Sequence, residues 1–121
     1  MKRILLVEDN DAIRENTTEL LELANYVVVP ACDGRQGLVM AQREKPDLII
    51  CDIMMPEIDG FHLLQLLRRD SFFEKTPFIF FTASAEKTEI KKGLEAGAND
   101  YIVKPFDADE LVQLIVKYLG E

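Results

Sequence analysis

Residues 48–60 read LIICDIMMPEIDG, and the first part of this stretch decides the fold. Residues 48–51 are apolar without any polar alternation, which is typical of a parallel strand buried on both faces. Asp52 follows directly, and more apolar residues come after it. A helix then begins near Asp59 and Gly60. The stretch therefore predicts one strand–loop–helix unit with a single carboxylate at the end of the strand.

The same arrangement recurs along the chain. Short apolar runs rich in β-branched or aromatic residues occupy residues 4–7, 26–29, 48–51, 78–81 and 101–103. Apolar residues at helical spacing fill the segments between them, as at Phe61, Leu64 and Leu67. Strict alternation of strand and helix predicts a parallel sheet with right-handed crossovers and with helices on both faces.

Proline and capping residues refine this prediction. Pro30 lies at the end of the second run, and proline cannot donate to a central ladder, so we expect the second strand at a sheet edge. An edge second strand fits a (βα)5 flavodoxin-like doubly wound fold, an α/β fold whose five parallel strands have the order 2-1-3-4-5. Asp107 and Glu110 are spaced as a capping box for the last helix.

Length and charge bound the function. The chain has 121 residues, so we expect one domain over residues 1–121. Its 22 acidic against 14 basic residues give a net charge of −8, which argues against direct binding to nucleic acid or to an anionic membrane. No apolar stretch approaches the ~20 residues of a membrane span. These features predict a soluble, cytoplasmic protein.

Two cysteines and one histidine are too few for a zinc site. Cys32 and Cys51 are expected to be reduced thiols, with Cys51 buried in a strand. His62 lies at the start of the third helix, and we expect it to face solvent rather than to act as a base.

Polar residues follow the predicted strands at their carboxyl ends, where ligands bind in this kind of sheet. The first strand ends at Glu8 and Asp9, the third at Asp52, the fourth at Thr82 and the fifth at Lys104. Polar residues at strand ends also serve as caps of the following helix, and Asp9, Asn10 or Asp11 could do so here. Asp52 is different, because an isolated carboxylate in an apolar stretch is costly unless it is paired or metal-bound. Three acids at one rim repel one another, and either a divalent cation or Lys104 must offset that repulsion. Mg²⁺, which prefers oxygen ligands, suits this arrangement.

A carboxylate nucleophile, a divalent cation, a hydroxyl and an ammonium are the groups that phosphoryl transfer requires. With this set of residues, the chain resembles a response-regulator receiver domain of the CheY type over essentially its whole length. The matching motifs are VED at 7–9, DIMMPEIDG at 52–60, TA at 82–83 and KPF at 104–106.

The resemblance implies a role for each matching residue. Asp52 is expected to be the phosphorylated residue, with Thr82 and Lys104 contacting the phosphoryl group. Asp9, Asp52 and the carbonyl of Met54 are expected to bind Mg²⁺, with Glu8 acting mainly through water. The resemblance further implies a switch made of Thr82 and Tyr101, and a cis peptide bond between Lys104 and Pro105.

It also implies partners. A histidine kinase or a histidine phosphotransfer protein would donate the phosphoryl group, the downstream effector is unknown, and phosphorylation-dependent dimerisation is compatible with the family. Because strand-forming residues follow the first three residues directly, we expect the domain to open its protein. The sequence leaves open whether it acts by itself or precedes an effector domain.

Three other functions remain as alternatives. A phosphatase of the haloacid-dehalogenase kind uses similar groups, but it needs an acid two residues after the nucleophile, where this chain has Met54. A nucleotide or flavin binder would need a phosphate-binding first loop, which Glu8 and Asp9 would repel. A phosphorylation-independent docking module would not need the full set of acids, Thr82 and Lys104.

The lifetime of the phosphorylated form depends on hydrolysis by water. Met54 and Ser84 are the side chains expected to flank the attacking water.

Overall fold

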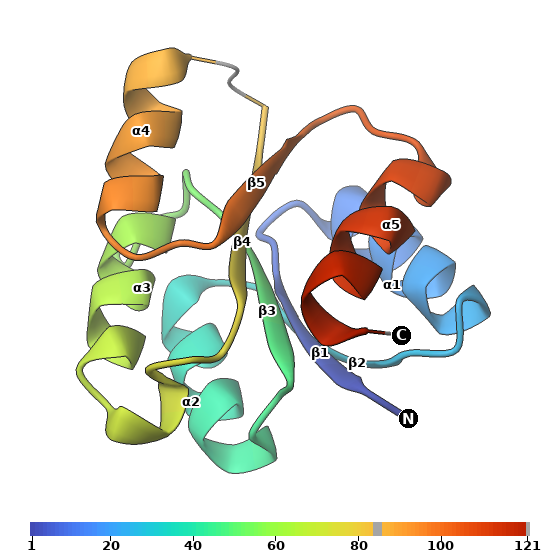
Figure 1. Cartoon of the computed structure of the whole chain (residues 1–121), viewed down its shortest axis with the longest axis horizontal. Helices are drawn as coiled ribbons and strands as arrows, with labels where there is room; N and C mark the ends of the chain where they lie inside the picture. Colours follow the sequence, from blue (N-terminus) through green and yellow to red (C-terminus); the bar gives the residue numbers. More distant parts are fainter. Residues whose placement is uncertain (84–85, 121) are drawn as a thin grey trace.

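The computed structural model describes residues 1–83 and 86–120. The chain alternates strands and helices from end to end (Figure 1). Its elements are β1 (Arg3–Val7), α1 (Asp11–Leu23), β2 (Val27–Ala31), α2 (Gly34–Glu44), β3 (Leu48–Asp52), α3 (Gly60–Arg68), the 3₁₀ turn η1 (Ser71–Phe73), β4 (Phe78–Thr82), α4 (Lys87–Glu95), β5 (Asp100–Val103) and α5 (Ala108–Leu119). The predicted alternation is confirmed.

All neighbouring strands are parallel, and their order is β2-β1-β3-β4-β5. This is the predicted order, with β2 at one edge. Val27 N–H donates to the Lys2 carbonyl, and the Ala31 carbonyl accepts from Glu8 N–H. Residues 27, 29 and 31 therefore face β1, and Pro30 places its missing donor on the open edge of the sheet.

Two apolar clusters lie on opposite faces of the sheet. One packs α2 and α3 against residues such as Val7, Cys51 and Phe80. The other packs α1 and α5 against residues such as Ile50 and Phe81. Figure 1 shows this layering, with α2, α3 and α4 on one side and α1 and α5 on the other. No helix in the described ranges is long and apolar enough to cross a membrane.

The ring of Phe80 lies between two helices that approach it through glycine. A Cβ atom on Gly93 of α4 would lie 2.6 Å from Phe80 Cε2, and one on Gly60 of α3 would lie 3.0 Å from Cε1. Phe61 packs edge-on against the same ring, with centroids 5.2 Å apart. Close approach to this ring requires glycine at position 93, whereas at position 60 the backbone of Asp52 and Ile53 is closer still than the ring.

The predicted capping box at the start of α5 is wrong. Asp107 occupies the N-cap position, but its side chain makes no capping hydrogen bond. Asp107 and Glu110 are both exposed to solvent. The acids of the first turn, Asp109 and Glu110, act instead through the helix dipole.

Arg68, at the end of α3, ties together two loops at the amino end of the sheet. Its guanidinium donates to the carbonyls of Phe73, Thr76 and Gly97, at 2.6, 2.8 and 2.9 Å respectively. It also donates to Asn99 Oδ1 at 3.0 Å, and that oxygen accepts from Phe78 N–H as well. Burial lowers the pKa of Arg68, but its planar fork still serves four acceptors at once.

Replacing Arg68 by lysine should therefore lower the free energy of unfolding by about 2–4 kcal/mol, because an ammonium cannot reach acceptors in both loops. Urea denaturation measures the change. The neighbouring, exposed Arg69 provides the matched control, and Arg69→Lys should change stability by no more than about 0.5 kcal/mol. Equal effects of the two substitutions would contradict the assignment.

Candidate functional site

Three carboxylates meet at the carboxyl edge of the sheet. Glu8 and Asp9 follow β1, and Asp52 is the last residue of the adjacent strand β3. One carboxylate oxygen from each lies within 4.8 Å of the other two. Glu8 and Asp52 are buried, at 0% and 8% exposure, whereas Asp9 is exposed. The structure therefore brings together the acids that the strand ends predicted.

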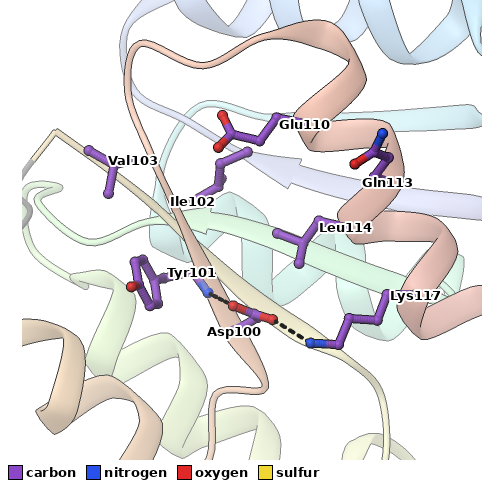
Figure 2. Close-up of a pocket in the computed structure, with 8 residues that line it drawn as sticks. All are labelled: Asp100, Tyr101, Ile102, Val103, Glu110, Gln113, Leu114 and Lys117. Atoms are coloured by element: carbon purple, nitrogen blue, oxygen red, sulfur yellow. Dashed lines mark hydrogen bonds and ion pairs between the residues drawn. The ribbon is translucent and has the colours of Figure 1, made fainter.

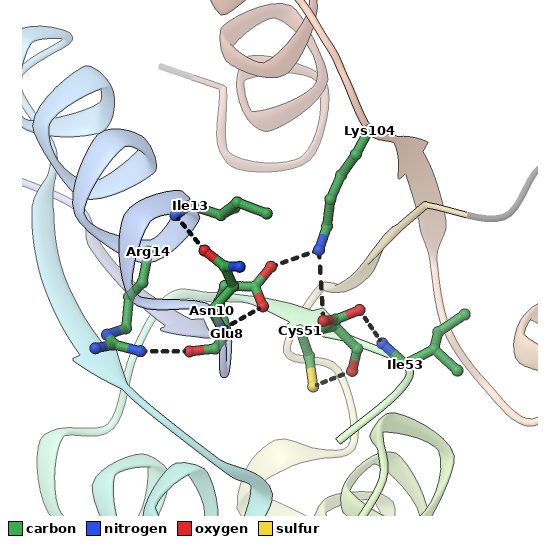
Figure 3. A network of polar contacts seen from close by, with 8 residues as sticks. Glu8, Asn10, Ile13, Arg14, Cys51, Ile53 and Lys104 are labelled. Atoms are coloured by element: carbon green, nitrogen blue, oxygen red, sulfur yellow. Dashed lines mark hydrogen bonds and ion pairs between the residues drawn. The ribbon is translucent and has the colours of Figure 1, made fainter. Parts of the chain in front are cut away.

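Lys104 lies directly against this cluster (Figure 3). Its Nζ donates to Glu8 Oε1 at 2.5 Å and contacts Asp52 Oδ2 at 3.4 Å. The second oxygen of Glu8 accepts from the backbone N–H of Asn10 at 3.0 Å. Both oxygens of Glu8 are thus occupied by protein donors, and the shorter contact of Lys104 is to Glu8 rather than to Asp52.

Helix capping does not explain the acid at position 9. The N-cap of α1 is Asn10, whose side chain accepts from Ile13 N–H at 3.0 Å. Arg14 fixes the same turn from the other side, because its guanidinium donates to the Glu8 carbonyl at 2.8 Å (Figure 3). Asn10 was among the residues expected to cap this helix, and that prediction is confirmed. Sequence reasoning missed Arg14, since nothing in its spacing indicates a contact with the rim.

Burial and mutual repulsion set the ionisation of the carboxylates. Burial, together with the neighbouring charge of Glu8, raises the pKa of Asp52 to about 7, although Lys104 opposes the shift. Burial would also raise the pKa of Glu8, but hydrogen bonds from Lys104 and Asn10 outweigh it and lower that pKa. Burial and the neighbouring Glu8 raise the pKa of Asp9. Without a further cation, the site holds a proton on Asp52 more readily than on Glu8.

The loop after Asp52 is held close to the carboxylate. Ile53 N–H donates to Asp52 Oδ1 at 2.8 Å, and Gly60 N–H donates to the Ile53 carbonyl at 2.8 Å. A Cβ atom on Gly60 would collide with the Asp52 carbonyl, so the start of α3 tolerates no side chain there. Met54 lies in this loop with its side chain 74% exposed, whereas Met55 is buried.

The other predicted residues lie on β4 and β5. Thr82 ends β4 and is buried, and its carbonyl accepts from Lys104 N–H at 2.7 Å. The peptide bond between Lys104 and Pro105 is cis. Ser84 lies outside the described residues.

Tyr101 lies away from the carboxylates, on β5 and 37% exposed. It borders a groove of about 530 Å³ between β5 and α5, whose wall includes Leu114 and Lys117 (Figure 2). Asp100 accepts from Tyr101 N–H at 2.9 Å and pairs with Lys117 at 3.5 Å. The exposed His62 on α3 is not part of the described carboxylate cluster.

This arrangement suits transfer of a phosphoryl group to oxygen. Asp52 supplies a nucleophilic carboxylate, and Lys104 supplies positive charge within contact distance. Clustered carboxylate oxygens suit a hard divalent cation. Met54 stands two residues after Asp52 and cannot transfer a proton, so the site lacks the general acid that a haloacid-dehalogenase phosphatase needs.

Comparison with known proteins identifies the same kind of domain that the sequence motifs indicated. A family model described as the response regulator receiver domain matches residues 4–116. The chain is 40% identical over 112 residues to the DNA-binding dual master transcriptional regulator RpaA of Synechocystis, a match covering 93% of this chain and 46% of RpaA. The chain spans about half the length of the curated relatives it matches.

Solved structures share the fold of this chain over nearly its whole length. The chemotaxis protein CheY4 of Vibrio cholerae superposes with a TM-score of 0.94 at 33% identity, covering 98% of this chain and 99% of CheY4. The receiver domain of the sensor histidine kinase PA1611 of Pseudomonas aeruginosa gives 0.92 at 32% identity, covering 99% of this chain and 98% of that one. That structure has a magnesium ion coordinated in its active-site cleft. The phosphatase and docking alternatives are not favoured.

The raised pKa of Asp52 predicts how stability depends on pH. Folded Asp52 keeps its proton up to about pH 7, while the unfolded residue releases it near its ordinary pKa of 3.8. Between these values the folded state binds more protons, so raising the pH favours unfolding. Without divalent cations, the free energy of unfolding should fall by roughly 2 kcal/mol between about pH 5 and pH 7.5.

Urea denaturation across this range measures the effect, and Asp52→Asn should flatten the profile. The raised pKa of Asp9 acts in the same direction. The lowered pKa of Glu8 acts in the opposite direction, but only below its ordinary value of 4.5 and therefore outside this range. An equally steep profile in Asp52→Asn would contradict the assignment.

Proposed function

Because the chain belongs to the response-regulator receiver domain family of two-component systems, we propose that residues 1–121 form one receiver domain phosphorylated on Asp52. The donor is a phosphohistidine on a histidine kinase or a histidine phosphotransfer protein. The observation that carries this proposal is the buried carboxylate of Asp52, which lies within contact distance of Lys104 and among the oxygens of Glu8 and Asp9.

Asp52 acts as the nucleophile. Its carboxylate oxygen attacks phosphorus, the phosphorus–nitrogen bond to the donor imidazole breaks, and the electron pair leaves with the imidazole. The product is an acyl phosphate on Asp52. The domain is not an enzyme in the ordinary sense, because it is itself the substrate, but its residues assist both formation and loss of the phosphoryl group.

The residues present fit Mg²⁺. Asp9, Asp52 and the backbone carbonyl of Met54 would hold the ion, and Glu8 would act mainly through water because both of its oxygens already accept protein hydrogen bonds. When bound, the ion supplies positive charge that offsets the repulsion among the carboxylates and the incoming phosphoryl oxygens.

Lys104 and Thr82 stabilise the transferred group. Lys104 Nζ lies 3.4 Å from Asp52 Oδ2 and would pair with a phosphoryl oxygen on that residue. The Thr82 hydroxyl would donate a hydrogen bond to another phosphoryl oxygen. A shift of Thr82 toward the phosphoryl group would then favour one position of Tyr101 and so alter the surface formed by α4, β5 and α5.

The surface beside the site supports docking of a phosphodonor protein. A groove of about 550 Å³ adjoins Lys104 and is lined by apolar side chains of α1 and of the loop after β5, including Ile13, Leu20 and Phe106. A phosphodonor protein docked there would lie next to Asp52. The output passes to an effector domain or to a separate protein, in the cytoplasm, and phosphorylation-dependent dimerisation through the α4–β5–α5 surface is one form it takes.

Asp52→Asn should abolish phosphorylation by a small phosphodonor such as acetyl phosphate in Mg²⁺, because an amide is not a nucleophile toward phosphorus. Mass spectrometry of the intact protein measures the added phosphoryl group. Asp109→Asn, an exposed acid in the first turn of α5, is the control and should label like the wild type. Labelling of Asp52→Asn at the wild-type rate would rule out this phosphorylation site.

Asp9→Ala should weaken Mg²⁺ binding at least about tenfold, because it removes an exposed carboxylate from the cluster. Isothermal titration with MgCl₂ measures the affinity. Asp11→Ala is the matched control, since Asp11 is also an acid of this segment but pairs with Arg14. The metal assignment is wrong if the two variants bind Mg²⁺ equally well.

Met54→Asn should shorten the lifetime of the acyl phosphate by about threefold or more, because an amide beside Asp52 orients the attacking water and a thioether does not. The exposed Met54 side chain leaves room for this substitution without disturbing the core. The decay of phosphorylated protein in Mg²⁺ measures the rate, and Met54→Leu should behave like the wild type. Equal decay of all three proteins would refute the water-orienting role.

A further inference from the structure

Phe81 is a buried aromatic residue beside the proposed phosphorylation site. It is 0% exposed, immediately precedes Thr82, and is the register partner of Asp52 in the β3–β4 ladder. Neighbouring parallel strands point register partners to the same face of the sheet. The Phe81 side chain thus belongs to the face covered by α1 and α5, where it lies in that apolar cluster.

The ring of Phe81 contacts residues on both sides of Pro105. Lys104 Nζ lies 4.5 Å from the ring centroid, and the ring of Phe106 packs edge-to-face against it with centroids 5.2 Å apart and planes at 64°. The Lys104 side chain is only 15% exposed. The ammonium therefore contacts three groups, which are the carboxylate of Glu8, the carboxylate of Asp52 and the face of the Phe81 ring.

The three contacts respond differently to phosphorylation. Forming an acyl phosphate removes the carboxylate charge of Asp52 and places phosphoryl oxygens nearby, so the ionic contacts of Lys104 must rearrange. The negative face of an aromatic ring attracts the ammonium in both states, because its quadrupole does not change. Such an attraction is strongest where water is largely excluded, as it is here.

We propose that Phe81 is a positioning residue that holds the ammonium of Lys104 at the rim, where it can pass from Glu8 to the phosphoryl group. This inference rests on the proposed function of the site. It assigns Phe81 an electrostatic role in addition to packing. The aromatic residues on the opposite face, Phe78 and Phe80, pack against each other with centroids 5.2 Å apart.

A test must weaken the ring's negative face with only a small change in its size. Incorporating 3,4,5-trifluorophenylalanine at position 81 does this, and the same replacement at the fully buried Phe78 is the matched control for fluorination of the core. The probe is beryllofluoride, a phosphoryl mimic, titrated at saturating Mg²⁺. The Mg²⁺ affinity is measured separately, and thermal unfolding checks that each protein is folded.

Fluorination at position 81 should weaken beryllofluoride binding about threefold to tenfold. Mg²⁺ affinity should stay within about twofold, and the position 78 protein should bind like the wild type. The ε-methylene signal of Lys104 should also move in the NMR spectrum of the position 81 protein, since its distance from the ring changes. A purely structural role for Phe81 would not separate the two affinities.

Unchanged beryllofluoride affinity at position 81, in a series whose wild type binds the probe, would overturn the inference and leave the proposed function intact. Equal losses at positions 81 and 78, or equal losses of beryllofluoride and Mg²⁺ affinity, would also overturn it. A wild type that fails to bind beryllofluoride in Mg²⁺ would overturn the proposed function and the inference together.

Discussion

The pair formed by Lys104 and Glu8 is the interaction on which the site depends. The two residues are 96 positions apart, and their contact joins the chain after β5 to the chain after β1. Both charges are largely withdrawn from water, so neither could be removed without leaving the other buried and uncompensated. The pair therefore fixes the first and last strand ends relative to one another, with Asp52 between them in contact with the ammonium.

This pairing also makes Glu8 and Asp52 differ in how readily they ionise. The negative charge of Glu8 is stabilised by Lys104 and by the Asn10 N–H group, so the carboxylate stays ionised at low cost. Asp52 makes the longer contact with the ammonium, and ionisation of its carboxylate is the more costly of the two. A buried acid that is costly to ionise gains most from an added cation or from conversion to an ester-like group. The geometry thus singles out Asp52 chemically, not merely by position.

Much of this was predictable from the sequence, for identifiable reasons. Pro30 indicated the edge strand, and the carboxyl ends of parallel strands must share one rim, so Glu8, Asp52 and Lys104 were expected together. The partner of each side chain was not predictable, because the difference between a contact of 2.5 Å to Glu8 and one of 3.4 Å to Asp52 depends on the side-chain conformation of Lys104. The capping box at Asp107 was predicted wrongly, since spacing places an acid at the N-cap position but does not fix the direction of its side chain.

The contact between Phe80 and Gly93 has an evolutionary consequence. Gly93 leaves room for the ring, so the volume of the strand residue and the size of the helix residue are set jointly. A lineage that replaced Phe80 by a smaller side chain would be free to acquire alanine at position 93, and the reverse order of changes would pass through a crowded intermediate. The two positions should therefore have a preferred mutational path, with the strand residue shrinking before the helix residue grows.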